Sequence, residues 1–290
     1  AVVNRDQILE AAESIEPLPA SVSRLIAVVS EPDFDARAIV DIVAHDPALA
    51  GEVLARANSA ASGSHAQIGD LQTAAARVGA NAVVEIAIRR SMQARLQSEV
   101  TAYGLAPNQL WVHSVATSVA ADVVRTAAAS TIPPMLTTAA LVHDIGKIVI
   151  AKCLSSQLTG LIAAAAATDG LDLTEVERDV LGIDHGEAGA VVVRKWGLPL
   201  SVQIALRQHH RPPNGDVFAQ ALTLADLLAH AAKEPETASG EEDLGLFMPL
   251  AAPHAAAVGI TTAKLPSLVM AIDHLTQGIM RNYGGGALAA

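Results

Sequence analysis

The sequence predicts an all-α protein, and three observations carry that prediction. Hydrophobic residues make up 51% of the 290 residues, which is ample apolar material for a packed core. Aromatic residues make up only 2%, so aliphatic side chains must fill that core, and alanine, the best helix former, is abundant. Apolar residues recur at helical spacing along most of the chain, and no strand-type alternation outweighs this pattern.

Prolines and capping residues divide the first 100 residues into short helices. Asp35 is a suitable N-cap, and Asp46 followed by Pro47 combines a capping side chain with the residue preferred at the first helical position. Gly79 separates the last two of these helices. We therefore expect helices over residues 6–15, from Ser21 to the break at Pro32, after Asp35, from Pro47 to Ala57, over 71–78 and over 82–96.

Longer apolar helices fill residues 101–232, and proline and glycine mark their ends. Thr174-Glu-Val-Glu177 has the composition of a helix start, a capping hydroxyl followed by acidic residues. Gly146 leaves room for a ligand to approach the backbone. Helices are expected over 110–128, 135–142, 158–167, 186–196, 201–210 and 219–232, and after Thr174. A polar loop over 233–243 then leads to a helix pair near 261–281 and a frayed tail after Gly284.

The charge balance disfavours a nucleic-acid partner. The formal net charge is −11, whereas proteins that hold nucleic acid by its phosphates usually present a basic face. The cationic cluster Arg89, Arg90 and Arg95 is better explained as the solvated edge of a helix. We therefore expect no direct DNA binding. A small phosphate ligand held at a metal stays open, because the metal supplies positive charge.

Cysteine use and the lengths of apolar runs predict a cytoplasmic protein. The single cysteine, Cys153, follows an apolar helical segment, where a buried, unreactive thiol is the better interpretation than a reactive one. The start of the sequence is polar and lacks the apolar core of a signal peptide. No uninterrupted apolar run reaches the length of a membrane span, so we expect no membrane partner.

Histidine and aspartate residues form a candidate metal site. His143 and Asp144 are adjacent, so neighbouring positions offer one imidazole nitrogen and one carboxylate oxygen to a divalent cation. A cation would also relieve the cost of burying Asp226, which lies in an apolar helical run. A lone histidine is more often an ordinary core or surface residue, and this interpretation is given to His45, His65, His230, His254 and His274. The candidate ligands are His113, His143, Asp144, His185, His209, His210 and Asp226.

The order His113, His143-Asp144, Asp226 resembles the HD superfamily of metal-dependent phosphohydrolases, which are all-α bundles. His185 and His209-His210 resemble the additional ligands of the HD-GYP cyclic-dinucleotide phosphodiesterases, and His143-Asp-Ile-Gly-Lys147 is similar to their local motif. The resemblance implies one or two divalent cations, with Asp144 as the bridging ligand where two bind. It also implies catalytic roles for Asp144 and Lys147, in which the lysine would meet a phosphate as a point charge. Iron or manganese is the preferred cation, with zinc or nickel as alternatives for a mixed nitrogen and oxygen ligand set.

The N-terminal half resembles a different branch, the HDOD domain, an HD-related output domain of bacterial signalling proteins. The motifs that carry this resemblance are Leu18-Pro-Ala-Ser21, Asp46-Pro-Ala-Leu-Ala50, Leu54-Ala-Arg-Ala-Asn-Ser-Ala60, Gln67-Ile-Gly-Asp-Leu71, Ala75-Ala-Arg-Val-Gly79, Leu110-Trp-Val-His-Ser114 and Trp196-Gly-Leu-Pro199. It covers about residues 15–230 as one compact unit. It implies an N-terminal helical HDOD subdomain over 1–100, an HD-like metal-site subdomain over 101–232, and a loop with C-terminal helices over 233–290.

One departure from the HD-GYP pattern bears on activity. No acid and no Gly-Tyr-Pro loop follow the histidine pair, where the sequence reads His209-His-Arg-Pro-Pro-Asn-Gly215. The first interpretation is therefore a regulatory module of bacterial signal transduction that binds a partner protein or a nucleotide. The alternatives are a metal-dependent phosphodiesterase or phosphohydrolase with a cyclic-dinucleotide-like substrate, and a cyclic-dinucleotide receptor without turnover.

Overall fold

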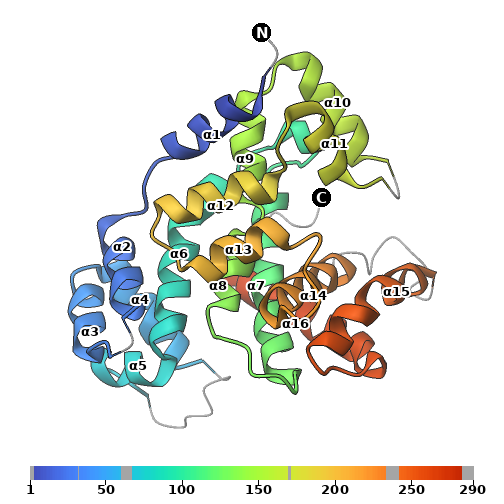
Figure 1. Cartoon of the computed structure of the whole chain (residues 1–290). Helices are drawn as coiled ribbons and strands as arrows, with labels where there is room; N and C mark the ends of the chain where they lie inside the picture. Colours follow the sequence, from blue (N-terminus) through green and yellow to red (C-terminus); the bar gives the residue numbers. More distant parts are fainter. Residues whose placement is uncertain (1–2, 32, 60–66, 169–170, 233–241, 283–290) are drawn as a thin grey trace. The chain divides into compact units, whose positions relative to one another are not determined.

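The computed structural model describes residues 3–31, 33–59, 67–168, 171–232 and 242–282 (Figure 1). Within these residues every regular element is a helix, and the strand-like pairing is limited to an isolated bridge between Val100 and Leu105. The predicted all-α class is confirmed. The expected tail after Gly284, most of the expected loop over 233–243, and His65 lie outside the described residues.

The chain divides into two compact units. One comprises residues 1–15, 96–193 and 200–290, and the other comprises residues 16–95 and 194–199. The smaller unit contains α2 (Ala20–Val29), α3 (Ala36–Ala44), α4 (Pro47–Ala57), α5 (Leu71–Val78) and nearly all of α6 (Ala80–Leu96). The subdomain limits expected from the sequence stay a prediction, because compactness alone does not show which segments fold independently.

The larger unit contains the remaining helices apart from the last two residues of α12, and its α14 packs against α7, α8 and α13 (Figure 1). Its elements are α1 (Arg5–Ser14), η2 (Thr101–Tyr103), α7 (Gln109–Ala127), α8 (Leu136–Val142), α9 (Ile145–Cys153), α10 (Ser156–Ala166), α11 (Leu173–Leu181), α12 (His185–Lys195), α13 (Leu200–Gln208), α14 (Val217–Ala232), α15 (Glu242–Ala257), η3 (Thr262–Lys264) and α16 (Leu265–Asn282). Among the described residues, each helix is too short or too polar to cross a membrane.

Small side chains let the central helices of the larger unit approach closely. The buried face of α7 includes Ala116, Ala120 and Ala121, and α7 packs against α8, α14 and α16. Small residues at a contact shorten the distance between helix axes. The packed pair α7 and α14 therefore holds His113 and Asp226 inside the core, where both side chains are buried.

The predicted N-caps Asp35 and Asp46 are confirmed, since each side chain accepts a hydrogen bond from the first turn of its helix. The predicted cap Thr174 is wrong. Asp172 caps α11 instead, and its carboxylate accepts hydrogen bonds from the backbone N–H groups of Thr174 and Glu175. The Thr174 hydroxyl itself donates to Asp172, so the stronger acceptor of the two sets the helix start.

The expected helix pair near 261–281 is also wrong. This range holds most of one helix, α16, and the short turn η3, whereas the second C-terminal helix, α15, lies upstream of it. Two prolines, Pro249 and Pro253, lie inside α15. A proline removes a helix hydrogen bond and usually ends a helix. The two prolines are therefore the reason why the sequence did not predict a helix in this segment.

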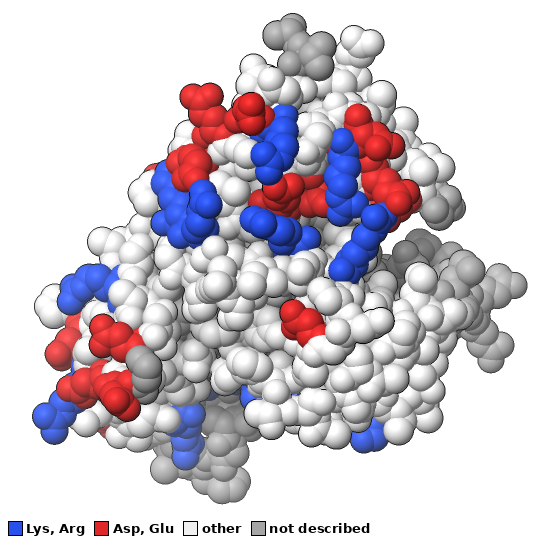
Figure 2. Space-filling view, in the orientation of Figure 1, with Lys and Arg blue, Asp and Glu red and all other residues white. Residues whose placement is uncertain are grey.

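Two expectations about side chains need correction. Cys153 is half-buried rather than buried, and desolvation raises the pKa of its thiol. The three arginines of the cationic cluster do not form a free solvated edge, since Arg89, Arg90 and Arg95 form ion pairs with Glu85, Glu52 and Glu16. Figure 2 shows basic side chains lying beside acidic ones on the face that it draws. Ion pairs elsewhere in the chain include Arg178–Asp184 and Arg5–Glu187.

Candidate metal centre

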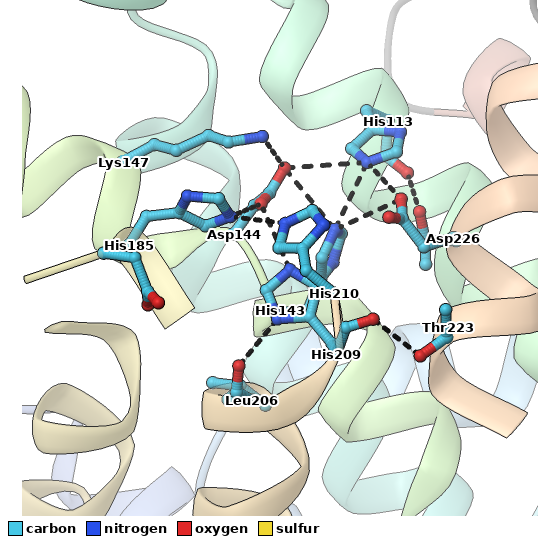
Figure 3. Close-up of polar contacts among 12 residues, drawn as sticks. His113, His143, Asp144, Lys147, His185, Leu206, His209, His210, Thr223 and Asp226 are labelled. Atoms are coloured by element: carbon cyan, nitrogen blue, oxygen red, sulfur yellow. Dashed lines mark hydrogen bonds and ion pairs between the residues drawn. The ribbon is translucent and has the colours of Figure 1, made fainter. Parts of the chain in front are cut away.

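The seven candidate ligands come from separate parts of the larger unit and meet at one point (Figure 3). His113 lies on α7, His143 and Asp144 lie between α8 and α9, His185 begins α12, His209 and His210 follow α13, and Asp226 lies on α14. Six of the seven side chains are buried, and His210 is exposed. The convergence that the sequence could only suggest is therefore present in the fold.

Asp144 lies between two groups of imidazoles. Its Oδ2 is 3.4 Å from His143 Nε2 and 3.6 Å from His113 Nε2. Its Oδ1 is 3.3 Å from His185 Nε2 and 4.0 Å from His209 Nε2. The two oxygens of one carboxylate thus face different groups, so Asp144 would be able to serve as a ligand in both.

Two ligand groups can be defined on either side of this carboxylate. The first group is His113, His143, Asp144 and Asp226, in which Asp226 Oδ1 lies 3.0 Å from His113 Nε2 and 3.5 Å from His143 Nε2. The second group is Asp144, His185, His209 and His210. Within each of the sets His113–His143–Asp144 and His185–His209–His210, potential ligand atoms lie within 4.8 Å of one another.

A break between two helices explains how adjacent residues point at the same centre. Helix α8 ends at Val142 and α9 begins at Ile145, so His143 and Asp144 lie at the junction. Asp144 occupies the N-cap position of α9, but its side chain makes no capping hydrogen bond. Both carboxylate oxygens therefore face the centre, where Lys147 Nζ donates to Oδ2 at 2.6 Å.

Two glycines let neighbouring helices bring His185 to Asp144. A Cβ on Gly146 of α9 would overlap the backbone carbonyl of His185. A Cβ on Gly186 of α12 would lie 2.6 Å from the carbonyl oxygen of Leu206 on α13. The close backbone approach expected at Gly146 is therefore to helix α12 rather than to a ligand, and only glycine provides it.

Hydrogen bonds on the outer side of three imidazoles fix which nitrogen faces the centre. His143 Nδ1 and His209 Nδ1 donate to backbone carbonyl oxygens three residues earlier, at 2.7 and 2.6 Å. His185 Nδ1 donates to Glu177 Oε2 at 2.8 Å. Because an acceptor holds each Nδ1 proton, each neutral ring directs the lone pair of Nε2 at the centre, as metal-bound histidines do.

Pairs of inward-facing nitrogens lie close enough together to bind one cation. The Nε2 atoms of His113 and His143 are 3.2 Å apart, and those of His185 and His210 are 2.9 Å apart. With a proton on one ring such a pair forms a hydrogen bond, and without that proton the two lone pairs repel unless a divalent cation binds both nitrogens. His209 Nε2 is buried and has no hydrogen-bond partner among the described residues. The residues present therefore fit a divalent cation, and their donors suit iron, manganese, zinc or nickel.

In the metal-free protein, protons supply the positive charge that the carboxylates require. Burial opposes the charged form of His143, but nearby carboxylates, chiefly Asp144, outweigh it and raise the pKa to about 10. Burial of His185 is likewise outweighed by Glu177 and Asp144, and its pKa rises to about 9. For His209, burial and the neighbouring imidazoles act together and lower the pKa to about 4. The carboxylates therefore make the centre bind positive charge, as protons or as a cation, more strongly than the histidines would without them.

The stability of the metal-free protein is expected to fall on both sides of pH 6.5, the ordinary pKa of histidine. The stability that His143 and His185 contribute is complete below pH 6.5 and is lost as the pH rises through about 9 and about 10, because the folded state binds the extra protons. His209 acts in reverse, and its contribution is lost as the pH falls from 6.5 through about 4. Thermal unfolding of chelator-treated protein across this range measures the effect. A Tm that rises steadily from neutral to alkaline pH would contradict it.

Two residues at the centre were not among the candidates drawn from the sequence. Glu177 is buried and contacts His185, but it lies on a helix that only tertiary packing brings near. His230, first interpreted as an ordinary histidine, has Nδ1 3.2 Å from Asp226 Oδ1 and its ring 4.4 Å from that of His113. The spacing of four residues between Asp226 and His230 places both on one helix face and could have signalled this pair.

Comparison with known proteins identifies the family. The family model of the HDOD domain matches residues 15–212, more than half of the chain. The chain belongs to the HDOD domain family. A curated relative of this HDOD protein, an uncharacterised protein of Treponema pallidum (strain Nichols), is 23% identical over 208 residues, which is 71% of this chain and 40% of the relative. The matched region thus spans less than half the length of that relative.

Solved structures share the fold of this HDOD protein. A candidate phosphohydrolase of Shewanella amazonensis is 22% identical, with a TM-score of 0.67 over 94% of this chain and 96% of that one. An HDOD domain protein of Geobacter sulfurreducens with unknown function is 16% identical, with a TM-score of 0.65 over 94% of this chain and 98% of that one. At these identities the likeness concerns the fold alone.

Proposed function

We propose that this HDOD protein binds two divalent cations at the His/Asp centre and uses them to hydrolyse a phosphoester. The observation that carries the proposal is the position of Asp144, whose two oxygens face different groups of imidazole nitrogens at 3.3 to 4.0 Å. A lone cation would need only one of these groups. The likeness of the fold to a candidate phosphohydrolase of Shewanella amazonensis is in keeping with this reaction class.

The chain's own residues divide into ligands and a substrate-facing charge. The first group would hold one cation and the second group the other, with Asp144 shared between them. Bound cations supply Lewis acidity toward a phosphoryl oxygen and lower the pKa of water. His210 is exposed and marks where solvent reaches the centre. Lys147, whose side chain is 15% exposed, would offer its ammonium group to a substrate phosphate.

A phosphodiester of the cyclic-dinucleotide class is the substrate that the HD-GYP resemblance supports. The protein as a whole carries a net charge of −11 and would repel such a substrate at long range. Attraction must therefore come from the centre itself, through bound cations and Lys147. Iron or manganese is the preferred pair of cations for this nitrogen and oxygen ligand set.

Metal analysis followed by a turnover assay tests the proposal. The full chain should bind about two equivalents of manganese or iron(II) and then release product from bis(p-nitrophenyl) phosphate or a cyclic dinucleotide. Asp144→Ala protein, purified in the same way, controls for contaminating phosphatases and should release none. Binding of no more than about one equivalent of iron, manganese or zinc after reloading would overturn the proposal, because a two-metal site requires both ions.

A regulatory module without turnover is the second candidate, and Arg211 favours it. This arginine follows His209-His210 where HD-GYP enzymes have an acid, and it donates to Asp172 Oδ2 at 2.8 Å and Glu175 Oε1 at 2.5 Å. The Arg211 side chain therefore points toward α11, and this position supplies no carboxylate to the centre. Binding of a cyclic dinucleotide without product would support a receptor. Capture of a signalling protein from the same organism, without nucleotide binding, would support a protein-binding module.

A further inference from the structure

Glu177 is a buried carboxylate that belongs to neither ligand group. Its side chain has 0% exposure, and it lies on α11, which contributes no candidate ligand. Three donors converge on it. Tyr103 Oη donates to Oε1 at 2.6 Å, and the backbone N and the Nδ1 of His185 donate to Oε2 at 2.9 and 2.8 Å. Burying a charged carboxylate is costly unless hydrogen bonds replace the lost water. The three donors provide those hydrogen bonds, so they stabilise Glu177 in its charged form.

The partner of Nδ1 distinguishes His185 from His143 and His209. His143 and His209 donate to backbone carbonyl oxygens, whereas His185 donates to a carboxylate. A carboxylate attracts the Nδ1 proton more strongly than a neutral carbonyl does, so Nε2 becomes a more basic metal ligand. The second ligand group therefore contains an imidazole that a carboxylate strengthens, whereas His143 of the first group donates its Nδ1 proton to a neutral carbonyl oxygen.

Tyr103 in turn holds Glu177. Its ring is buried, and it meets the ring of His185 edge-on with centroids 6.4 Å apart. Burial and the charge of Glu177 raise the pKa of Tyr103, so its hydroxyl remains protonated and donates. Lys147 Nζ lies 5.8 Å from the centroid of the same ring. Tyr103 thus packs against both the imidazole that Glu177 orients and the lysine that pairs with Asp144.

We propose that Glu177 is the positioning residue of the cation site formed by the second ligand group. Through its hydrogen bond to His185, Glu177 fixes which nitrogen faces the cation and selectively raises the affinity of that site. Tyr103 in turn fixes the position of Glu177. This inference rests on the proposed two-cation centre. It assigns the acid a role in metal affinity rather than in contact with the cation or the substrate.

The Glu177→Gln variant tests the inference without a change of side-chain size. A glutamine has one accepting oxygen, whereas the three donors around Glu177 use two. Placed where Oε2 lies, that oxygen still accepts from both N–H groups of His185, while the NH2 group faces Tyr103 Oη, which can rotate to accept. The variant therefore keeps the hydrogen bond to Nδ1 but loses the negative charge that makes Nε2 a more basic ligand. We expect the affinity of one cation to fall about 10- to 100-fold and that of the other by less than about threefold.

Cobalt(II) titration of the metal-free full chain, followed by visible absorption, resolves the two affinities. Glu175→Gln is the matched control, since Glu175 lies exposed on the same helix and pairs with Arg211. Tyr103→Phe should weaken the same site by a smaller factor, and it gives the same test if the glutamine variant does not fold. Equal weakening of both sites, or of neither, would overturn the positioning role. A wild-type chain that binds no cation would instead overturn the two-cation centre itself.

Discussion

The Asp144→Asn variant is expected to lose both cations together. The amide that replaces the carboxylate has nearly the same size, but one oxygen becomes an NH2 group, which cannot bind a cation, and the negative charge disappears. Since Oδ1 and Oδ2 face different imidazole groups, either orientation of the amide removes a ligand from one group and charge from both. We expect each affinity to fall at least about 100-fold, measured by metal content after dialysis and by titration.

Asp226→Asn is the informative control, because Asp226 is also a buried carboxylate but, of the two ligand groups, contacts the first, at His113 and His143. Its carboxylate also contacts His230, which belongs to neither group. This substitution should weaken one cation and largely spare the other. If both variants lose a single cation, or if the Asp144 variant retains two, Asp144 does not bridge the groups.

The same Asp144→Asn substitution should destabilise the metal-free fold. In that state Asp144 is paired with Lys147 at 2.6 Å and with the charged form of His143, both in a low-dielectric core. Removing one partner of a buried ion pair leaves the other without compensation, at a cost of about 3–5 kcal/mol. Because the Lys147 side chain is 15% exposed and can turn toward water, we expect the lower end. Urea unfolding of chelator-treated wild type and variant measures the difference.

Local patterns were enough to predict most of the helices and to single out the seven side chains that meet at the centre. The cap at Asp46 and the helical spacing of apolar residues act within a few residues, and the structure follows them. The helix that contains Pro249 and Pro253 does not follow its local pattern, because its packing against α14 outweighs the two lost backbone hydrogen bonds. The start of α11 differs for a smaller reason, since the sequence offered two neighbouring capping groups and the carboxylate of Asp172 is the stronger acceptor.

The parts of the centre that could not be predicted depend on contacts between distant helices. His143 and Asp144 are adjacent in the sequence, so their shared position at the centre could be expected from it. Glu177 is eight residues from His185, and their contact arises only because α11 and α12 turn back on each other. Gly146 looked like a ligand-facing glycine, but its neighbour is the backbone of α12. Sequence spacing identifies ligands on a shared element, while supporting residues require the tertiary fold.

Removal of the cations is expected to lower the thermal stability of the protein substantially. A ligand that binds only the folded state stabilises it by about 4 kcal/mol when its free concentration is about 1,000 times Kd. In a chain of this size each kcal/mol shifts Tm by about 2–4 °C, so even one cation should raise Tm by about 10 °C. The physical source is the centre itself, where Asp144, Asp226 and Glu177 are buried in charged form and need compensation.

Differential scanning calorimetry with and without a chelator measures this shift, and manganese added back should restore the original Tm. Chelator should leave the Tm of Asp144→Asn unchanged, since that variant has no bound cation to lose, and this comparison separates metal removal from other effects of the chelator. Equal Tm values for wild type before and after chelation, with metal content confirmed to change, would mean that the folded state gains nothing from the cation. The convergence of buried carboxylates and imidazoles would then be maintained by protons and Lys147 alone, and the two-cation centre would have no support in stability.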